Sequence, residues 1–379
     1  MRLFLLDLWV KKELKKKMKK KPPENPSPQL SGYEKQLIHV IKEQTEKYNK
    51  NNVTRTQAYY NFYLQHPEIH WALLGHMVSR NGGWNMTDLK GELLTRLLPE
   101  KDQNAFFSFL ERGNWLIFQD VFPQFLIYDL SVKAKADMFH LFPSFHISTF
   151  METMWRYFWK KGDCYTLAIA TVINEQSYLE KRVIQNAYFK KTVTGTVGFK
   201  LYDFLRFNNI LFPYCTDQKG QKTELVGDTL RHFTSLHERI LLGKRLYALL
   251  FQRQNMLPGV LKWTREHPHT GSRKDYWPHL FNDVNGSAPR ALYKRRIKNC
   301  KLRKGANRLY SPKLRYAWKN IPHEEAEVGD WFEDYHIIEY LNHKEVDVDG
   351  KVCREYCRTL EKIELTVMAK EAVSLREEE

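Results

Sequence analysis

Cysteine is scarce in this chain, and none of it follows the spacing of a familiar site. The 379 residues contain five cysteines, an odd number, at positions 164, 215, 300, 353 and 357. Cys353 and Cys357 are four residues apart, whereas zinc and redox sites typically use a Cys-x-x-Cys spacing. We therefore expect free thiols in a reducing compartment, with Cys353 and Cys357 as structural residues.

The signatures of the commonest enzyme classes are also missing. The chain has no Gly-x-Ser-x-Gly, no phosphate-binding Walker loop, no Gly-x-Gly-x-x-Gly and no His-Glu-x-x-His. A di-metal centre in a helical bundle needs glutamates together with Glu-x-x-His pairs on facing helices. The acids and histidine on suitable helices form no such set; they are Glu152, Glu175, Glu180, Glu238 and His237. The pair Glu333–His336 lies in the acidic C-terminal part. We expect no metal site.

Long hydrophobic runs are absent as well. The apolar stretches at 165–173 and 239–251 are too short or too charged to cross a bilayer. At the N-terminus the apolar residues precede the lysines, the reverse of a secretory signal. Residues 1–21 instead form a basic amphipathic tail, and 22–32 a proline-rich linker. The tail suits contact with an anionic membrane surface; a solvated lysine tail, or a start at Met18, explains the same pattern.

Positive charge is abundant but uneven. The formal charge is +16, yet residues 320–379 hold 17 acids against 7 basic residues, so residues 1–319 carry +26. Residues 291–319 contain no acid and interleave tyrosine and tryptophan with lysine and arginine. That pattern is compatible with nucleic-acid binding, but no known nucleic-acid module surrounds it. Packing against the acidic segment 323–335 explains it equally, so we treat 291–379 as a basic-then-acidic extension packed on the core.

What the chain does have is helical periodicity. Hydrophobic residues make up 42% of the sequence and aromatic residues 14%, which indicates a globular protein with a bulky core. The spacing predicts an all-α fold: one large helical domain over 33–290, with a short β-hairpin near the C-terminus at 345–353, where Asp-Gly separates alternating valines. The expected helices cover 33–48, 54–66, 67–80, 87–98, 105–118, 147–161, 165–185 and 228–252.

Residues 66–89 are dense in polar and aromatic side chains. We interpret His66 as a helix N-cap before Pro67, and the glycines at 82–83 as the helix end. His70 and His76 are six residues apart, so they point to different sides of a helix. This favours a polar cluster over a metal site, with His70, His76, Arg80 and Asp88 as candidate ligand-binding residues.

A second polar stretch covers residues 267–287. Ser272, Arg273, His279 and Asp283 resemble the last motif of the phosphatidic-acid phosphatase and vanadium haloperoxidase superfamily, in which the Arg binds phosphate and the His is the nucleophile. Residues 143–146, Pro-Ser-Phe-His, resemble its middle motif, with Phe145 in place of glycine. The first motif, a Lys followed by Arg-Pro, is absent. The resemblance implies catalytic roles for Arg273, His279 and Asp283, helped by Ser272 and His146 as phosphate-binding residues.

Three longer stretches, 52–92, 233–247 and 267–284, resemble the YppC-like family of Bacillus-type bacteria. The resemblance covers most of residues 33–335 and implies a cytoplasmic bacterial protein, possessing no assigned activity and no known cofactor. Our leading hypothesis is a non-enzymatic, cytoplasmic binding or scaffold protein with a His/Arg/Trp-lined polar pocket, peripheral at the inner membrane face. The alternatives are a phosphoester hydrolase or phosphate-binding enzyme, and nucleic-acid binding through 291–319.

Overall fold

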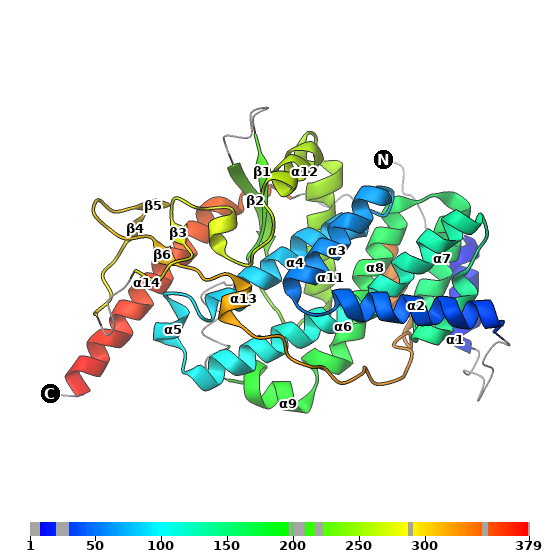
Figure 1. The fold of residues 1–379 in the computed structure, drawn as a ribbon, viewed down its shortest axis with the longest axis horizontal. Coiled ribbons are helices and arrows are strands. Elements are labelled where there is room, and N and C mark those ends of the chain that lie inside the picture. Colours follow the sequence, from blue (N-terminus) through cyan, green and yellow to red (C-terminus); the bar gives the residue numbers. More distant parts are fainter. Residues whose placement is uncertain are drawn as a thin grey trace.

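The computed structural model describes residues 8–19, 30–196, 199, 209–216, 223–286, 291–342 and 348–377. Its architecture is mainly helical, as the periodicity predicts, with short strands gathered toward the C-terminal half (Figure 1). Within the described residues, no helix is both long and apolar enough to cross a membrane.

The N-terminal half is a stack of helices around one long central helix. α6 (Glu100–Ala134) runs through the middle of the molecule and contacts the helices on either side of it. The other elements of this half are α1 (Leu8–Lys19), α2 (Gly32–Tyr48), α3 (Asn52–Gln65), α4 (His70–Asp88), α5 (Leu94–Leu97), η1 (Phe139–Phe145), α7 (Thr149–Lys161), α8 (Cys164–Leu179), η2 (Glu180–Ile184), α9 (Ala187–Phe189) and η3 (Lys190–Thr194).

The C-terminal half mixes short strands with helices. β1 (Asn209–Cys215) and β2 (Thr223–Thr229) form an antiparallel pair in which Asn209 lies opposite Thr229. The remaining elements are α11 (Leu236–Tyr247), η4 (Ala248–Gln252), α12 (Met256–Glu266), η5 (Arg273–Asp275), β3 (Phe281–Asn282), β4 (Ile297–Lys298), β5 (Lys301–Leu302), β6 (Leu309–Tyr310), α13 (Leu314–Ala317), η6 (Tyr335–Leu341) and α14 (Val352–Glu377). β3 pairs parallel with β6, and β4 pairs antiparallel with β5.

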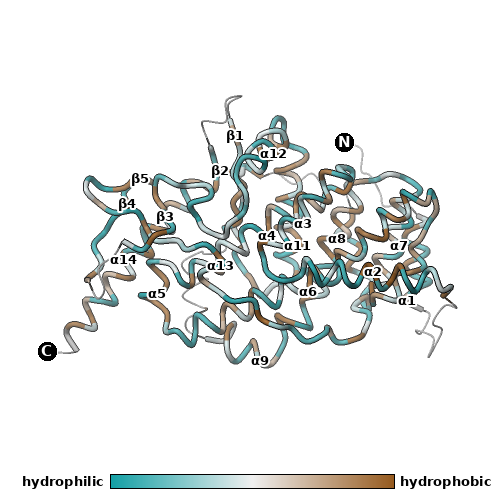
Figure 2. Tube along the Cα trace, in the orientation of Figure 1, coloured by the Kyte–Doolittle hydropathy of each residue, from teal (hydrophilic) through white to brown (hydrophobic). Residues whose placement is uncertain are grey.

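Aromatic side chains dominate the core. Trp84, Trp155 and Trp263 are completely buried, and hydrophobic segments recur along α6, α7 and α8 (Figure 2). Trp155 donates its indole N–H to Gln124 at 2.8 Å, so even the polar atom of this large side chain is satisfied inside the core. The abundance of aromatic residues in the sequence therefore corresponds to tight packing between helices.

Two local predictions on residues 66–88 are wrong. α4 begins at His70 and continues through both glycines to Asp88, and His66 is the C-cap of α3. A Cβ at Gly83 would lie 2.3 Å from Asn52 Oδ1 and 2.5 Å from His269 Nε2. Gly83 is thus required by the close approach of α3 and the 267–275 turn, and it does not terminate the helix.

Other boundaries also differ from the sequence prediction. Asp228 and Thr229 belong to β2, so the helix expected from residue 228 begins only at Leu236. The hairpin expected at 345–353 is not found where the structure describes that stretch, since residues 348–351 carry no strand and Val352 starts α14; residues 343–347 lie outside the described residues. The short hairpin near the C-terminus is β4–β5, whose two-residue turn lacks the Asp-Gly signature.

The described part of the N-terminal tail lies against the body. Val10 and Leu14 of α1 are completely buried, and Lys17 donates to Glu152 of α7 at 2.8 Å. Most of the linker 22–32 falls outside the described residues, but Ser31 caps α2 in a capping box with Glu34. The apolar face of α1, the part of the tail that the structure describes, therefore packs against α7.

The basic and acidic parts of the extension pair differently from expectation. Arg295 bonds Glu361 of α14 at 2.7 Å, and Arg296 bonds Glu92 of the core. Segment 323–335 instead runs along the helical body, where Arg112 donates to the carbonyl of Glu324 and Lys181 bonds Glu333. The acidic partner of the basic segment is α14.

The expectation of five free thiols is also wrong. Cys300 and Cys357 form a disulfide, whereas Cys164, Cys215 and Cys353 are free. The bond joins the β4–β5 hairpin to α14.

Candidate functional site

Helix α4 presents two faces to different surroundings. One face carries Arg80, Trp84, Thr87 and Asp88 and meets the 267–275 turn. The other face lines a cavity between α4 and α8. Both polar stretches identified in the sequence therefore meet at this helix.

Arg80 and its neighbours fix the 267–275 turn by hydrogen bonds. Arg80 donates Nη2 to the carbonyl of His267 at 2.8 Å, and its guanidinium lies 4.3 Å from the ring centroid of Trp263. Thr87 donates its hydroxyl to the carbonyl of Gly271 at 2.5 Å. Burial lowers the pKa of Arg80 to about 10, which leaves the side chain cationic at neutral pH. These contacts hold the turn rather than a ligand.

Arg273 is completely engaged by neighbouring side chains. Its Nε donates to both carboxylate oxygens of Asp88 at 2.9 Å, and its Nη2 reaches Asp88 Oδ2 at 2.6 Å and Asn85 Oδ1 at 2.9 Å. Nη1 donates to the hydroxyl of Tyr276 at 2.7 Å. Burial lowers the pKa of Arg273, but the charge of Asp88 outweighs it and holds that pKa well above its ordinary value. The guanidinium stays charged and is saturated with protein partners.

The other residues of the phosphatase-like motif diverge. Ser272 donates its hydroxyl to the carbonyl of Ser311 at 2.6 Å and accepts from the N–H of Lys274. Asp283 accepts from Lys274 at 2.7 Å and pairs with Lys313 at 3.1 Å, and the lysine bond lowers its pKa to about 2. Burial lowers the pKa of His279, whose ring hydrogen-bonds the backbone of Cys300. The structure does not join these groups into a triad.

The three histidines named as ligand candidates occupy separate environments. His70 bonds the hydroxyl of Tyr247 at 2.8 Å and stacks on Phe251. His76 bonds the carbonyl of Thr56 at 2.8 Å, and burial holds its pKa well below the ordinary value. His146 ends η1 with a φ of 55° and lines a different cavity of about 110 Å³. Of the candidates, only Arg80, Asp88, Ser272 and Arg273 meet at one junction.

The second face of α4 lines a cavity of about 230 Å³, which we name the α4–α8 cavity. It lies among α3, α4, α6, α8 and α11, and aliphatic and aromatic side chains make up most of its wall. An apolar cavity of about 150 Å³ is large enough to hold benzene. The α4–α8 cavity can therefore accept a larger, mainly apolar molecule.

Glu175 of α8 is the distinctive polar group of this cavity. Its carboxylate accepts from Gln176 at 3.1 Å and from the Trp71 side chain, two partners that carry no charge. Burial raises its pKa to about 8 despite these bonds. The two arginines in the wall are engaged elsewhere, since Arg55 pairs with Glu111 and Arg239 with Glu180. A carboxyl group without a cationic partner among the described residues thus faces an apolar space.

The sequence alone indicates Glu175 only as a possible ligand of a di-metal centre in a helical bundle, and it does not predict this cavity. The usable signal was a single carboxylate inside the apolar run of 165–179, on a helix that is otherwise buried. Asn52 and His269 were also missed. His269 donates Nε2 to Asn52 Oδ1 at 2.8 Å across Gly83, a contact between residues 217 positions apart.

The comparisons with known proteins agree with the sequence resemblance. The chain is 42% identical over 241 residues to the uncharacterized protein YppC of Bacillus subtilis strain 168, an alignment that covers 64% of this chain and 73% of that protein. No solved structure matches the chain significantly. The family model described as a protein of unknown function (DUF2515) matches residues 47–348, which include α4, the α4–α8 cavity and the 267–283 turn. The chain belongs to this family.

Proposed function

We propose that this protein binds a small molecule with an apolar body and a cationic head group in the α4–α8 cavity. The observation that carries the proposal is Glu175, a carboxyl with no charged partner among the described residues, facing an apolar cavity. Binding sites for small molecules are typically apolar hollows with a few convergent polar groups of perturbed pKa. We infer a binding role rather than catalysis, because the arginines in the wall already pair with protein carboxylates.

The charge of the ligand follows from the pKa of Glu175. With a pKa of about 8, most of the carboxyl is protonated at pH 7 in the empty cavity. An ammonium group entering the cavity forms an ion pair with the carboxylate and displaces its proton. An anionic ligand meets repulsion or an uncharged acid, so it gains no such pair.

A matched ligand series tests this proposal. Benzylamine, benzyl alcohol and benzoate share one ring and differ in head group, and their binding can be compared by thermal shift and calorimetry. We expect benzylamine to bind at least tenfold more tightly than benzoate, a difference of about 1.4 kcal/mol. Equal affinities, or no binding by any of the three, would contradict the proposal.

Two variants locate the site. Glu175→Gln removes the carboxylate and should abolish the preference for the amine. Glu43→Gln, an exposed glutamate on α2, is the matched control and should leave the preference unchanged.

The phosphoester alternative has less support from the geometry. Arg273 is saturated by Asp88, Asn85 and Tyr276, so a phosphate would have to displace a buried carboxylate. Asp283 is held by two lysines instead of orienting His279. We therefore do not propose hydrolysis.

A second candidate function is the binding of an anionic polymer, such as single-stranded nucleic acid, by the basic segment. Arg295 and Arg296 are paired with carboxylates, but Lys298, Lys301 and Arg303 on and beside the β4–β5 hairpin are exposed. Tyr316 is also 71% exposed, with the guanidinium of Arg315 4.6 Å from its ring centroid, an aromatic and cationic pair of the kind that nucleic-acid bases stack on. Titration with a labelled oligothymidylate at increasing salt tests this, with loss of binding in a Lys298→Glu/Lys301→Glu variant as the expected result.

Contact with the anionic inner face of a cytoplasmic membrane would use only the lysines of α1. The apolar face of α1 is buried against α7, while Lys12, Lys15 and Lys16 are exposed. Such contact is therefore electrostatic and should be lost at high salt in a vesicle sedimentation assay.

A further inference from the structure

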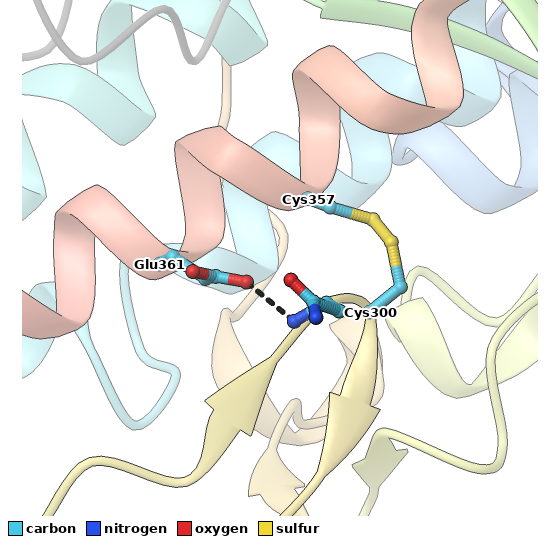
Figure 3. Close-up of a disulfide and its surroundings, with 4 residues drawn as sticks. Cys300, Cys357 and Glu361 are labelled. Carbon is cyan, nitrogen blue, oxygen red and sulfur yellow. Dashed lines mark hydrogen bonds between the residues drawn. A yellow bond between two sulfur atoms is a disulfide. The ribbon is translucent and has the colours of Figure 1, made fainter.

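Three of the five cysteines meet where the β4–β5 hairpin contacts α14. The sulfur atoms of Cys300, Cys353 and Cys357 all lie within 4.8 Å of one another. Cys353 and Cys357 are one turn apart on α14, so they share a face. Cys300 approaches Cys357 from the turn of the hairpin (Figure 3). We name this group the three-thiol cluster.

The position of Cys300 is fixed by more than its sulfur. Asn299 and Cys300 have φ values of 52° and 60° and form the two-residue turn between β4 and β5. The N–H of Asn299 donates to Glu361 Oε1 at 2.7 Å, one turn beyond Cys357 on α14 (Figure 3). Glu364 also accepts from the N–H of Ile297 at 3.0 Å. Main-chain contacts therefore hold the hairpin against α14 in addition to the disulfide.

We propose that the three-thiol cluster is a metal-binding site for a thiophilic divalent ion, Zn²⁺ in the first place. Zinc bound by thiolates has Zn–S distances of about 2.3 Å, which places tetrahedral sulfur ligands about 3.8 Å apart. After reduction, the sulfurs of Cys300 and Cys357 must separate from their bonded positions to about 3.8 Å, and Cys353 already lies within 4.8 Å of both. Thiolate ligands select soft or borderline ions, whereas Mg²⁺ and Ca²⁺ prefer oxygen.

In the proposed site a water molecule supplies the fourth ligand. Cys353 lines a surface cleft of about 530 Å³ together with Glu224, so solvent approaches the cluster from the Cys353 side. Three thiolates with one exchangeable position form a complete tetrahedral set.

The disulfide between Cys300 and Cys357 is the metal-free, oxidised state of the same site. A dithiol or phosphine reductant supplies two electrons, the S–S bond breaks, and two thiols form as the reductant is oxidised. Binding of Zn²⁺ then releases the thiol protons to solvent as the three Zn–S bonds form. An oxidant that restores the disulfide removes two ligands and releases the ion.

The test uses the full chain, reduced with a phosphine and then freed of it, with Zn²⁺ and Co²⁺ as the probes. We expect about one Zn²⁺ per chain, and intense thiolate-to-cobalt absorption that is lost on oxidation. Cys353→Ser should lower the affinity at least a hundredfold, while Cys164→Ser, a free cysteine outside the cluster, should bind like the unaltered chain. Binding by Cys353→Ser equal to that of Cys164→Ser, or no binding by the reduced chain, would overturn the proposal.

A second measurement uses the unaltered chain, so its outcome does not depend on whether a variant folds. Zn²⁺ should slow the alkylation of Cys300, Cys353 and Cys357 by iodoacetamide at least tenfold in the reduced chain, as read by peptide mapping, and leave the rate at Cys164 unchanged. Equal alkylation rates with and without Zn²⁺ would show that the three cysteines do not bind zinc together, which would overturn the proposal.

Discussion

Arg273 and Asp88, 185 residues apart, form a buried ion pair in which the guanidinium Nε contacts both carboxylate oxygens at 2.9 Å. This pair joins the end of α4 to the turn that follows α12, and Asn85, which also accepts from Arg273, lines the α4–α8 cavity. The two polar stretches are thus one structural unit that supports the cavity wall.

Loss of the Asp88 charge should destabilise this unit. Asp88→Asn leaves the Arg273 guanidinium buried without a counter-ion, and we expect a loss of about 3 kcal/mol in the free energy of unfolding. Urea denaturation measures it. Asp88→Leu combined with Arg273→Met should recover part of the loss; a double variant less stable than Asp88→Asn would contradict this view of the pair.

A methyl group at Gly83 should separate α4 from the 267–275 turn. The added Cβ of Gly83→Ala meets Asn52 and His269 at 2.3 and 2.5 Å, so their mutual hydrogen bond must break, at a cost of about 2–4 kcal/mol. Gly113→Ala, on α6, is the matched control because nothing lies within 4 Å of its Cβ. The control should gain up to about 1 kcal/mol from helix propensity. Equal stability of the two variants would show that the glycine at 83 is not a packing requirement.

The contribution of two carboxyls, Glu175 and Asp120, to stability should fall as the pH rises, because both hold their protons in the folded state. Burial raises the pKa of Glu175 from 4.5 to about 8 and that of Asp120 from 3.8 to about 7. Above pH 5 both carboxyls are largely ionised in the unfolded chain, while the folded chain keeps their protons until about pH 7 to 8, so their contribution to the free energy of unfolding decreases over this range. The contribution of Glu175 is about 2–4 kcal/mol over this range. Urea titrations at pH 5, 6.5 and 8 should show a shallower fall for Glu175→Gln; an unchanged pH slope would mean that Glu175 is ionised in the folded protein.

The contact between the β4–β5 hairpin and α14 should loosen when Glu364 loses its charge, although the Cys300–Cys357 disulfide still joins them. Glu364 is completely buried and accepts from Tyr293, from the N–H of Arg296 and from the N–H of Ile297, at 2.6, 2.8 and 3.0 Å. Glu364→Gln replaces one acceptor oxygen by a donor and should cost about 2 kcal/mol locally. Hydrogen exchange at residues 294–302 should quicken at least tenfold. Leu365→Ala, an exposed neighbour, should leave exchange there unchanged, and a similar effect from both variants would point to general loosening of α14.

The helical body could be predicted because its periodicity is local. The spacing of apolar residues in 33–48 and 147–161 reproduces α2 and α7 closely, since each helix buries one continuous stripe. The end of α4 could not be predicted. Two consecutive glycines usually indicate the end of a helix, and only the close approach of Asn52 and His269 explains why glycine stands at 83 inside α4.

Contacts between distant residues account for the other differences. The β1–β2 pair depends on the register between two separate segments. Considered alone, the sequence around residue 228 resembles the start of a helix. The three-thiol cluster joins Cys300 to α14 across 57 residues, which no cysteine spacing reveals. Of the candidate site, Arg80 and Asp88 could be named from the sequence, but their contacts with the 267–275 turn and the role of Glu175 required the structure.

The most direct test of a ligand site at Glu175 is a crystal structure of the protein grown with benzylamine. We predict that the ring occupies the α4–α8 cavity and that the amine nitrogen lies within hydrogen-bond distance, about 2.7–3.0 Å, of the Glu175 carboxylate. A cavity filled by its own side chains, or benzylamine bound elsewhere on the molecule, would contradict the proposed function.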